Sequence, residues 1–76
     1  MDNLINKSFK WNSWKITFKE NNKYQIVREL VRGTMTENER IYSSFGHRQI
    51  AVIVDDTPYI LTFSDDYKSV SFKIQN

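Results

Sequence analysis

Apolar and polar residues alternate along most of the chain, and this alternation predicts β-strands. Within residues 14–18, Trp14, Ile16 and Phe18 alternate with Lys15 and Thr17. Because successive side chains of a strand point to opposite faces of a sheet, this pattern indicates a strand with one buried face. Further strands are expected at residues 9–11, 40–45, 47–54, 59–63 and 69–74.

The segment from Tyr24 to Val31 fits two periodicities. Its aliphatic residues have helical spacing, but Tyr24, Ile26 and Leu30 also lie on one face of a strand. Eight residues is short for a helix and the neighbouring segments are strands, so we favour a strand.

Short polar turns separate these segments and predict the topology. Asn21-Asn22, Asp55-Asp56 and Asp65-Asp66 are residues that suit turns for backbone reasons. Short connections imply sequential antiparallel pairing. We therefore predict an all-β fold: a small antiparallel meander of six to seven strands that closes into a β-barrel, with at most one short helix, as a single domain over residues 1–76. The expected core is Ile16, Phe18, Ile50, Val52, Leu61, Phe63 and Phe72.

Composition supports a small folded protein and excludes several chemistries. Aromatic residues make up 14% of the 76 residues, which suits a core built from few side chains. The absence of cysteine excludes disulfides, thiolate metal sites and a thiol nucleophile. The first seven residues have no apolar segment of the signal-peptide type, and the longest apolar run, residues 50–54, is too short to span a membrane. A cytoplasmic location is the expectation.

The sequence contains no convincing catalytic or metal-binding pattern. The paired aspartates fall in expected turns, and His47 is the only histidine, with Ser43 and Ser44 as the nearest serines. No nucleophile elbow supports a catalytic triad, and two glycines are too few for a phosphate-binding loop. We predict no catalytic residue, no cofactor and no metal, and therefore no enzymatic activity.

Charge is divided unevenly and suggests one candidate ligand. Residues 1–32 hold seven Lys/Arg against three acidic residues, whereas residues 33–76 hold four against six. Exposed aromatic side chains with lysines interleaved between them can bind single-stranded nucleic acid, because the rings stack on bases and the lysines contact phosphates. The residues for this alternative are Lys10, Trp11, Lys15 and Lys19. In the simpler interpretation, Trp14, Ile16 and Phe18 are core and the lysines keep the other face soluble.

Arginine and tyrosine residues in the middle of the chain suggest a protein partner, because both types are enriched at binding hot spots. The candidate partner-binding residues are Arg28, Arg40, Tyr42, His47 and Arg48. We favour a non-catalytic binding module that acts through its outer surface on a protein partner, or on itself, by a sheet edge or by the Arg40/Tyr42/Arg48 face. Its size fits a small viral or accessory modulator.

Several short segments also resemble the lipocalin-like (calycin-type) β-barrel modules. They are residues 7–11 (KSFKW), 16–18 (ITF), 33–34 (GT), 45–48 (FGHR) and 59–67 (YILTFSDDY). The resemblance implies a β-barrel. The chain departs from it at Asn21-Asn22, where a glycine is expected, and it is about half the length of a ligand-enclosing lipocalin. We therefore expect side chains, not a ligand, to fill the interior.

Overall fold

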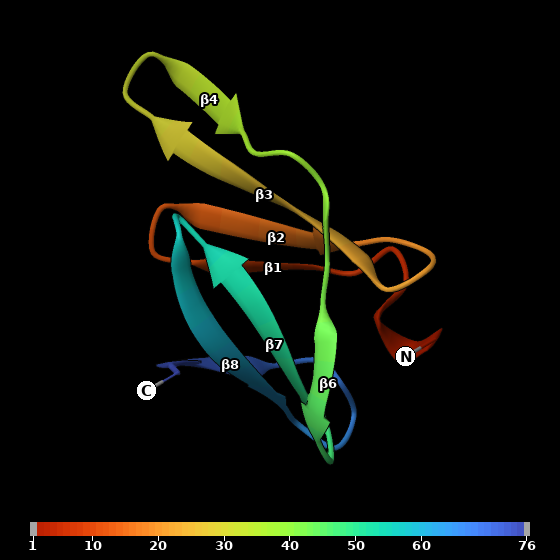
Figure 1. Ribbon diagram of the computed structural model, residues 1–76. Helices are drawn as coiled ribbons and strands as arrows, with labels where there is room; N and C mark the ends of the chain where they lie inside the picture. Colours follow the sequence, from red (N-terminus) through yellow and green to blue (C-terminus); the bar gives the residue numbers. More distant parts are fainter. Residues whose placement is uncertain (1, 76) are drawn as a thin grey trace. The chain divides into compact units, whose positions relative to one another are not determined.

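The computed structural model of the chain describes residues 2–75 and is all-β (Figure 1). Its contacts divide the chain into an N-terminal unit, residues 1–41, and a C-terminal unit, residues 42–76. No helix of the described part is long and apolar enough to cross a membrane. In chain order the elements are η1 (Asp2–Leu4), a 3-10 turn, β1 (Ser8–Trp11), β2 (Trp14–Phe18), β3 (Lys23–Leu30), β4 (Gly33–Thr36), β5 (Arg40–Ile41), β6 (Ser43–Gly46), β7 (Gln49–Val54), β8 (Thr57–Phe63) and β9 (Val70–Ile74).

The N-terminal unit is an antiparallel sheet with the order β1-β2-β3-β4, in which β5 also pairs with β3. The pairing places Ile16 opposite Ile26 and Phe18 opposite Tyr24, and all four side chains are buried. Residues directly opposite each other share a face, so this face is apolar. The strand predicted over residues 24–31 is confirmed by β3.

Asparagines lie in two turns of the N-terminal unit, between β1 and β2 and between β2 and β3. Asn12 lies between β1 and β2 with φ of 53°, and Asn21 and Asn22 lie between β2 and β3 with φ of 62° and 61°. Asparagine tolerates this left-handed region because its short polar side chain bonds to the local backbone. The turn that the sequence predicts at Asn21-Asn22 is therefore confirmed.

The C-terminal unit is an antiparallel meander with the order β6-β7-β8-β9. Ile50, Val52 and Val54 alternate along β7, and all three are buried. Asp55 and Asp56 join β7 to β8 with φ of 51° and 61°, which is the type I′ pattern of a two-residue hairpin. The predicted turn is thus confirmed, although β8 begins at Thr57 and includes Pro58.

Most of the expected core is buried, and the strand count is higher than expected. Six of the seven predicted core residues are buried, whereas Phe72 is half-buried because β9 is an edge strand. The described residues form nine strands where six to seven were predicted, for two reasons. A strand that was not predicted, β4, begins at Gly33, and the segment 40–45 is divided between the two sheets at Tyr42.

Tyr42, which was expected on the outer surface with Arg40, is buried at the division between the two sheets. Tyr42 is only 6% exposed, whereas Ile41 and Phe45 are 69% and 53% exposed. The prediction assumed one continuous strand, but a break in pairing at Tyr42 and a bulge between Ser44 and Gly46 interrupt the alternation. The expected barrel is not confirmed either, since each described sheet has two edges.

Candidate protein-binding surface

One row of side chains crosses the whole N-terminal sheet near the turn between β3 and β4. The pairing places Trp11 opposite Trp14 and Trp14 opposite Arg28. Arg28 in turn lies opposite Met35. The four side chains therefore share a face, and strand alternation makes it the face of buried Ile26. The Arg28 guanidinium lies 5.0 Å from the centre of the Trp14 ring, in a cation–π contact.

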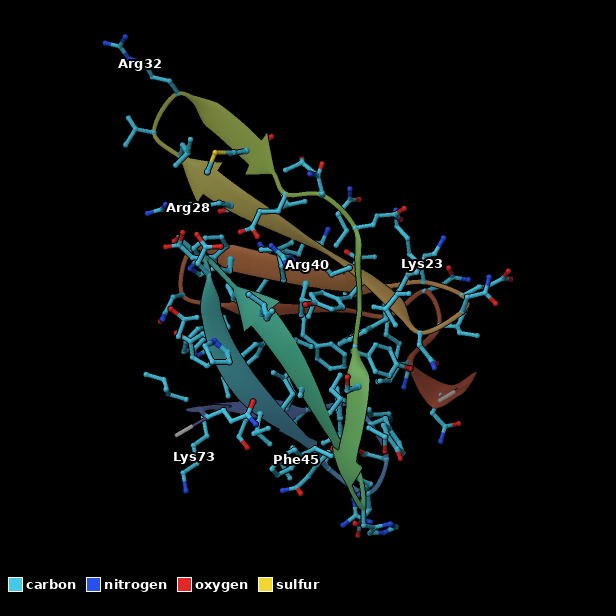
Figure 2. The ribbon with its side chains drawn as sticks, viewed as in Figure 1. Lys23, Arg28, Arg32, Arg40, Phe45 and Lys73 are labelled. Atoms are coloured by element: carbon cyan, nitrogen blue, oxygen red, sulfur yellow. The ribbon has the colours of Figure 1, made fainter. Side chains whose placement is uncertain are left out.

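The hairpin of β3 and β4 ends in exposed apolar residues. Leu30 and Met35 are 47% and 46% exposed, and Val31, in the turn, is fully exposed. Gly33 closes the turn at φ of 136°, a conformation that side chains rarely adopt, although a Cβ there would meet no atom within 4 Å. We call Trp14, Arg28, Leu30, Val31 and Met35 the hairpin surface; Figure 2 shows Arg28 on this hairpin and Arg32 at its turn.

The lysines of the nucleic-acid alternative lie on the opposite face from its tryptophan. Lys10 pairs with Lys15, and Lys10 directly precedes Trp11 on the same strand, so Trp11 points the other way. The Lys10 ammonium lies 3.7 Å from the Glu29 carboxylate. Lys10 and Lys15 therefore lie on one face of the sheet and Trp11 on the other.

Lys19 makes two polar contacts within its own sheet. Its Nζ lies 2.6 Å from Oε2 of Glu39 and donates to Oε1 of Gln25 at 3.2 Å. The hydrogen bond and the charge of Lys19 lower the pKa of the Glu39 carboxyl, with a further contribution from the charge of Lys23. Lys19 is thus engaged in joining β2 to the segment between β4 and β5.

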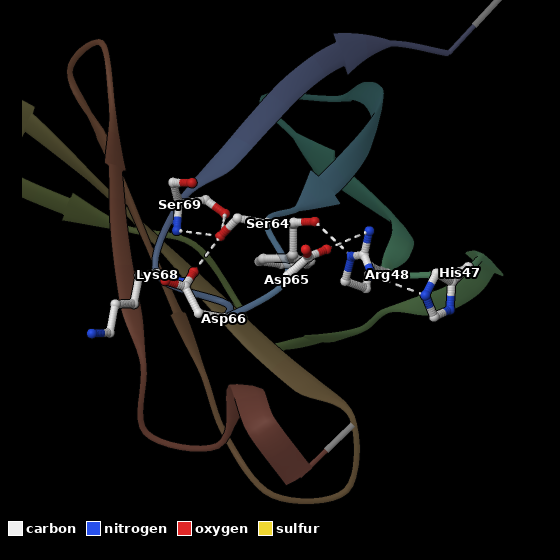
Figure 3. Close-up of polar contacts among 8 residues, drawn as sticks. His47, Arg48, Ser64, Asp65, Asp66, Lys68 and Ser69 are labelled. Atoms are coloured by element: carbon white, nitrogen blue, oxygen red, sulfur yellow. Dashed lines mark hydrogen bonds and ion pairs between the residues drawn. The ribbon is translucent and has the colours of Figure 1, made fainter.

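Arg48 is held by the loop that follows β8 (Figure 3). Its Nε donates to the Phe63 carbonyl at 3.2 Å, its Nη2 lies 2.8 Å from Oδ1 of Asp65, and its Nη1 lies 2.9 Å from His47 Nε2. The Phe63 amide donates back to the Arg48 carbonyl at 2.9 Å. Arg48 and His47 therefore fasten the β6–β7 turn to the end of β8.

The residues of the predicted arginine–tyrosine surface are divided between the two units. Arg28 and Arg40 belong to the N-terminal unit, whereas Tyr42, His47 and Arg48 belong to the C-terminal unit. The burial of Tyr42 shows that its predicted outward position was wrong. Arg40 lies exposed on β5, where it pairs with the position of Tyr24.

The second aspartate pair shapes the loop between β8 and β9. Ser64 Oγ donates to Oδ1 of Asp66 at 2.7 Å, and the same oxygen accepts from the Lys68 amide at 3.1 Å. The Ser69 amide donates to Ser64 Oγ at 3.1 Å. These bonds are those of a turn, which confirms the interpretation of Asp65-Asp66. Within residues 2–75, no three His, Cys, Asp or Glu side chains form a group that could hold a metal ion.

A second apolar surface lies on the outer side of the C-terminal sheet. It is a hollow of about 320 Å³ lined by Phe45, Ile60 and Ile74 together with the polar residues Gln49, Thr62, Lys73 and Gln75. The side chains of Phe45 and Ile74 are exposed. The sequence pattern did not predict this hollow. The bulge next to Phe45, for which Gly46 is the visible signal, redirects this side chain.

The hairpin surface was also missed, although the sequence carries a signal for it. Leu30 and Val31 precede Arg32 and Gly33, and a glycine two residues after an apolar strand is typical of a hairpin turn. An apolar residue within such a turn has no core to enter. No protein-family model, curated protein or solved structure matches the chain. The surface is therefore interpreted from its own chemistry.

Proposed function

We propose that this chain is a non-catalytic binding module and that the hairpin surface recognises a protein partner. The observation that carries the proposal is the apolar end of the hairpin, where fully exposed Val31 follows Leu30 in the turn and exposed Met35 lies on β4. A clustered apolar surface in contact with water is unfavourable, and burial against a partner removes that cost.

The composition of the hairpin surface supports a protein as the partner. Tryptophan, arginine and methionine are enriched at protein interfaces, and lysine is depleted there. The surface holds Trp14, Arg28 and Met35 and contains no lysine. The cation–π contact also holds Arg28 in place before binding, which reduces the conformational entropy lost on association.

The nucleic-acid alternative has less support from the same sheet. A stacking surface needs aromatic rings and cations on one side. Here Lys10 and Lys15 lie on the face opposite Trp11, and both Lys10 and Lys19 are paired with glutamates. A role as a viral or accessory modulator, a cytoplasmic location and closure into a lipocalin-like barrel remain predictions on which the proposal does not depend.

Site-specific photo-crosslinking tests the proposal. A photoreactive amino acid at Val31 is expected to form adducts with protein in an extract of the source cells, whereas the same group at the exposed turn residue Asp56 forms few. Met35→Glu should remove the Val31 adducts, because a charge buried at an interface is costly. Equal labelling from both positions, or labelling that survives Met35→Glu, contradicts the proposal.

A salt titration with a single-stranded oligonucleotide tests the alternative. Phosphate contacts release counterions, so nucleic-acid binding through the lysines would weaken steeply with salt. We expect no salt-dependent binding that is lost on replacing Lys10, Lys15 and Lys19 with glutamine. Binding of that kind, with Met35→Glu unaffected, would replace the protein-binding proposal with the nucleic-acid one.

A further inference from the structure

The four longer edge strands of the described sheets differ in how they resist pairing with another chain. Natural edges are protected by lysines, prolines, bulges or short length. β1 carries Lys10, β9 carries Lys73 and β6 is bulged. β4, Gly33–Thr36, has no charge, no proline and no bulge, and all four of its residues are exposed. Short length is its only protection.

The backbone of β4 offers hydrogen-bonding groups on its outer side. The Glu37 amide donates to the Ile26 carbonyl at 2.9 Å, so Glu37 turns its backbone groups toward β3. In an antiparallel pair the backbone groups of every second residue face the partner strand. The N–H and C=O of Met35, two residues before Glu37, therefore also face β3. Thr34 and Thr36 consequently direct their N–H and C=O groups toward the open edge.

We propose that a second copy of this chain occupies the edge of β4, as an antiparallel partner strand related by a two-fold axis at Met35. This inference rests on the proposed function and names the partner of the same hairpin. In this arrangement Thr34 of each copy lies opposite Thr36 of the other, and the two pairs exchange four backbone hydrogen bonds. Threonine pairs are favourable across strands.

The apolar and charged side chains of the hairpin also support this two-fold arrangement. The two Met35 side chains face each other on the axis, next to Leu30, so the apolar end of the hairpin is covered from both copies. The antiparallel direction also places the basic turn at Arg32 beside residues 37–39 of the other copy, which contain Glu37 and also Glu39, already paired with Lys19 of its own chain. Opposite charges therefore meet twice, and each copy supplies both signs.

A single engineered cysteine tests the axis, because the chain has none of its own. The two Met35 residues would form a non-hydrogen-bonded pair with Cα atoms about 4.5 Å apart, which a disulfide can span. Under mild oxidation, Met35→Cys is expected to form a covalent dimer about tenfold faster than Val31→Cys, although Val31 is the more exposed. Equal or faster dimer formation by Val31→Cys overturns the proposal.

Two proline variants test the hydrogen bonds without a crosslink. Thr36→Pro removes an outward N–H and follows a residue in strand conformation, which proline permits, whereas Met35→Pro removes an N–H that faces β3. In sedimentation equilibrium from micromolar to millimolar concentration, the wild-type chain should dimerise reversibly. Thr36→Pro should stay monomeric with its melting temperature nearly unchanged, and Met35→Pro should melt lower.

The outcomes separate this inference from the proposed function. If the wild-type chain stays monomeric, or Thr36→Pro dimerises as well as the wild type, the second copy is wrong. Photo-adducts from Val31 to an unrelated protein would then leave the binding function standing with a different partner. If the Val31 adducts are also absent, both the partner and the function are wrong.

Discussion

Aliphatic side chains of similar size differ in exposure between the two units of this chain. In the C-terminal unit, Ile50 and Val52 are buried in β7, whereas Leu30 and Val31 of the N-terminal unit stand exposed at a hairpin end. The two arginines also differ in their contacts. Arg48 is hydrogen-bonded to the backbone at the end of β8, whereas the Arg28 guanidinium lies over the Trp14 ring on the hairpin surface. Residue type alone therefore does not identify a binding surface; the contacts already made within the chain decide it.

The difference gives the units different expected roles. In the C-terminal unit, alternate residues of β7 form a core, and Arg48 is used in loop closure through its bonds with Phe63 and Asp65. The N-terminal unit leaves an apolar hairpin and an unprotected edge at β4. We expect substitutions in the first unit to change mainly stability and substitutions at the hairpin surface to change mainly association.

The largest effect should come from the core of the C-terminal unit. Phe63→Ala removes a ring that is 2% exposed and lies 5.6 Å from the Tyr67 ring, and we expect a loss of about 3–5 kcal/mol in the free energy of unfolding. The matched control, Phe45→Ala, removes the same ring from a position that is 53% exposed and should cost less than about 1 kcal/mol. Urea denaturation measures both. Similar losses would show that the burial contrast between the two phenylalanines is wrong.

Substitution of Arg48 should reduce mainly stability, whereas substitution of Arg28 should reduce mainly association. Arg48→Ala removes the bond to Phe63 and an ion pair with Asp65, whose side chain is 91% exposed and so contributes little. It also leaves alanine at φ of 55°, and the total cost should be about 1–3 kcal/mol. Arg28→Ala loses a cation–π contact worth about 0.5–1 kcal/mol.

Thermal melts and the Val31 photo-adducts together check this contrast. Arg48→Ala should lower the melting temperature more than Arg28→Ala and leave the adducts unchanged, while Arg28→Ala should weaken them. Arg48→Gly serves as a control, because glycine accepts positive φ and isolates the loss of the side chain. The reverse order of effects would assign the interface to the Arg48 loop.

Much of the fold follows from the sequence because strand alternation and turn residues are local signals. The period of two predicted β2 and β7, and the Asn and Asp pairs predicted their turns. The pairing partner of a strand is not local. Residues 40–45 alternate like one strand, yet Arg40–Ile41 pairs with β3 and Ser43–Gly46 with β7, and Tyr42 between them is buried although it was expected on the surface.

The sequence predicted the residue types of the candidate surface but not where in the fold they lie. Arginine and an edge were expected to matter, and Arg28 remains in the proposed surface. Tyr42 and Arg48 were lost from it because burial and hydrogen bonding depend on contacts with distant residues, such as Phe63 for Arg48. Sequence patterns indicate which side chains can bind and do not show which are already occupied.

A smaller effect is expected at the tight turns of the two units. Asp56 has φ of 61°, and Asp56→Gly removes the steric cost of that conformation, so we expect a gain of a few tenths to about 1 kcal/mol. Asn22 has the same φ of 61°, but asparagine accepts the left-handed region well, and Asn22→Gly should gain less. Urea midpoints measure both variants. A loss of stability in Asp56→Gly would indicate that the aspartate side chain stabilises its turn.

The smallest effect concerns the ion pair that joins β2 to the acidic segment after β4. Lys19 lowers the pKa of Glu39, first by its hydrogen bond and then by its charge, so Lys19→Gln should raise that pKa toward the ordinary value for glutamate. Because the folded pKa lies below the unfolded one, the pair stabilises the fold above the unfolded pKa. That contribution is lost as pH falls through the folded pKa. The melting temperatures of the wild type and Lys19→Gln should therefore differ slightly at neutral pH and converge in acid.

A carboxyl NMR titration reports the Glu39 pKa directly, and Lys10→Gln, which breaks the ion pair with Glu29, should leave it unchanged. If Lys19→Gln does not raise the pKa, Lys19 is not held by Glu39 and is available for other contacts, which would restore one lysine to the nucleic-acid alternative.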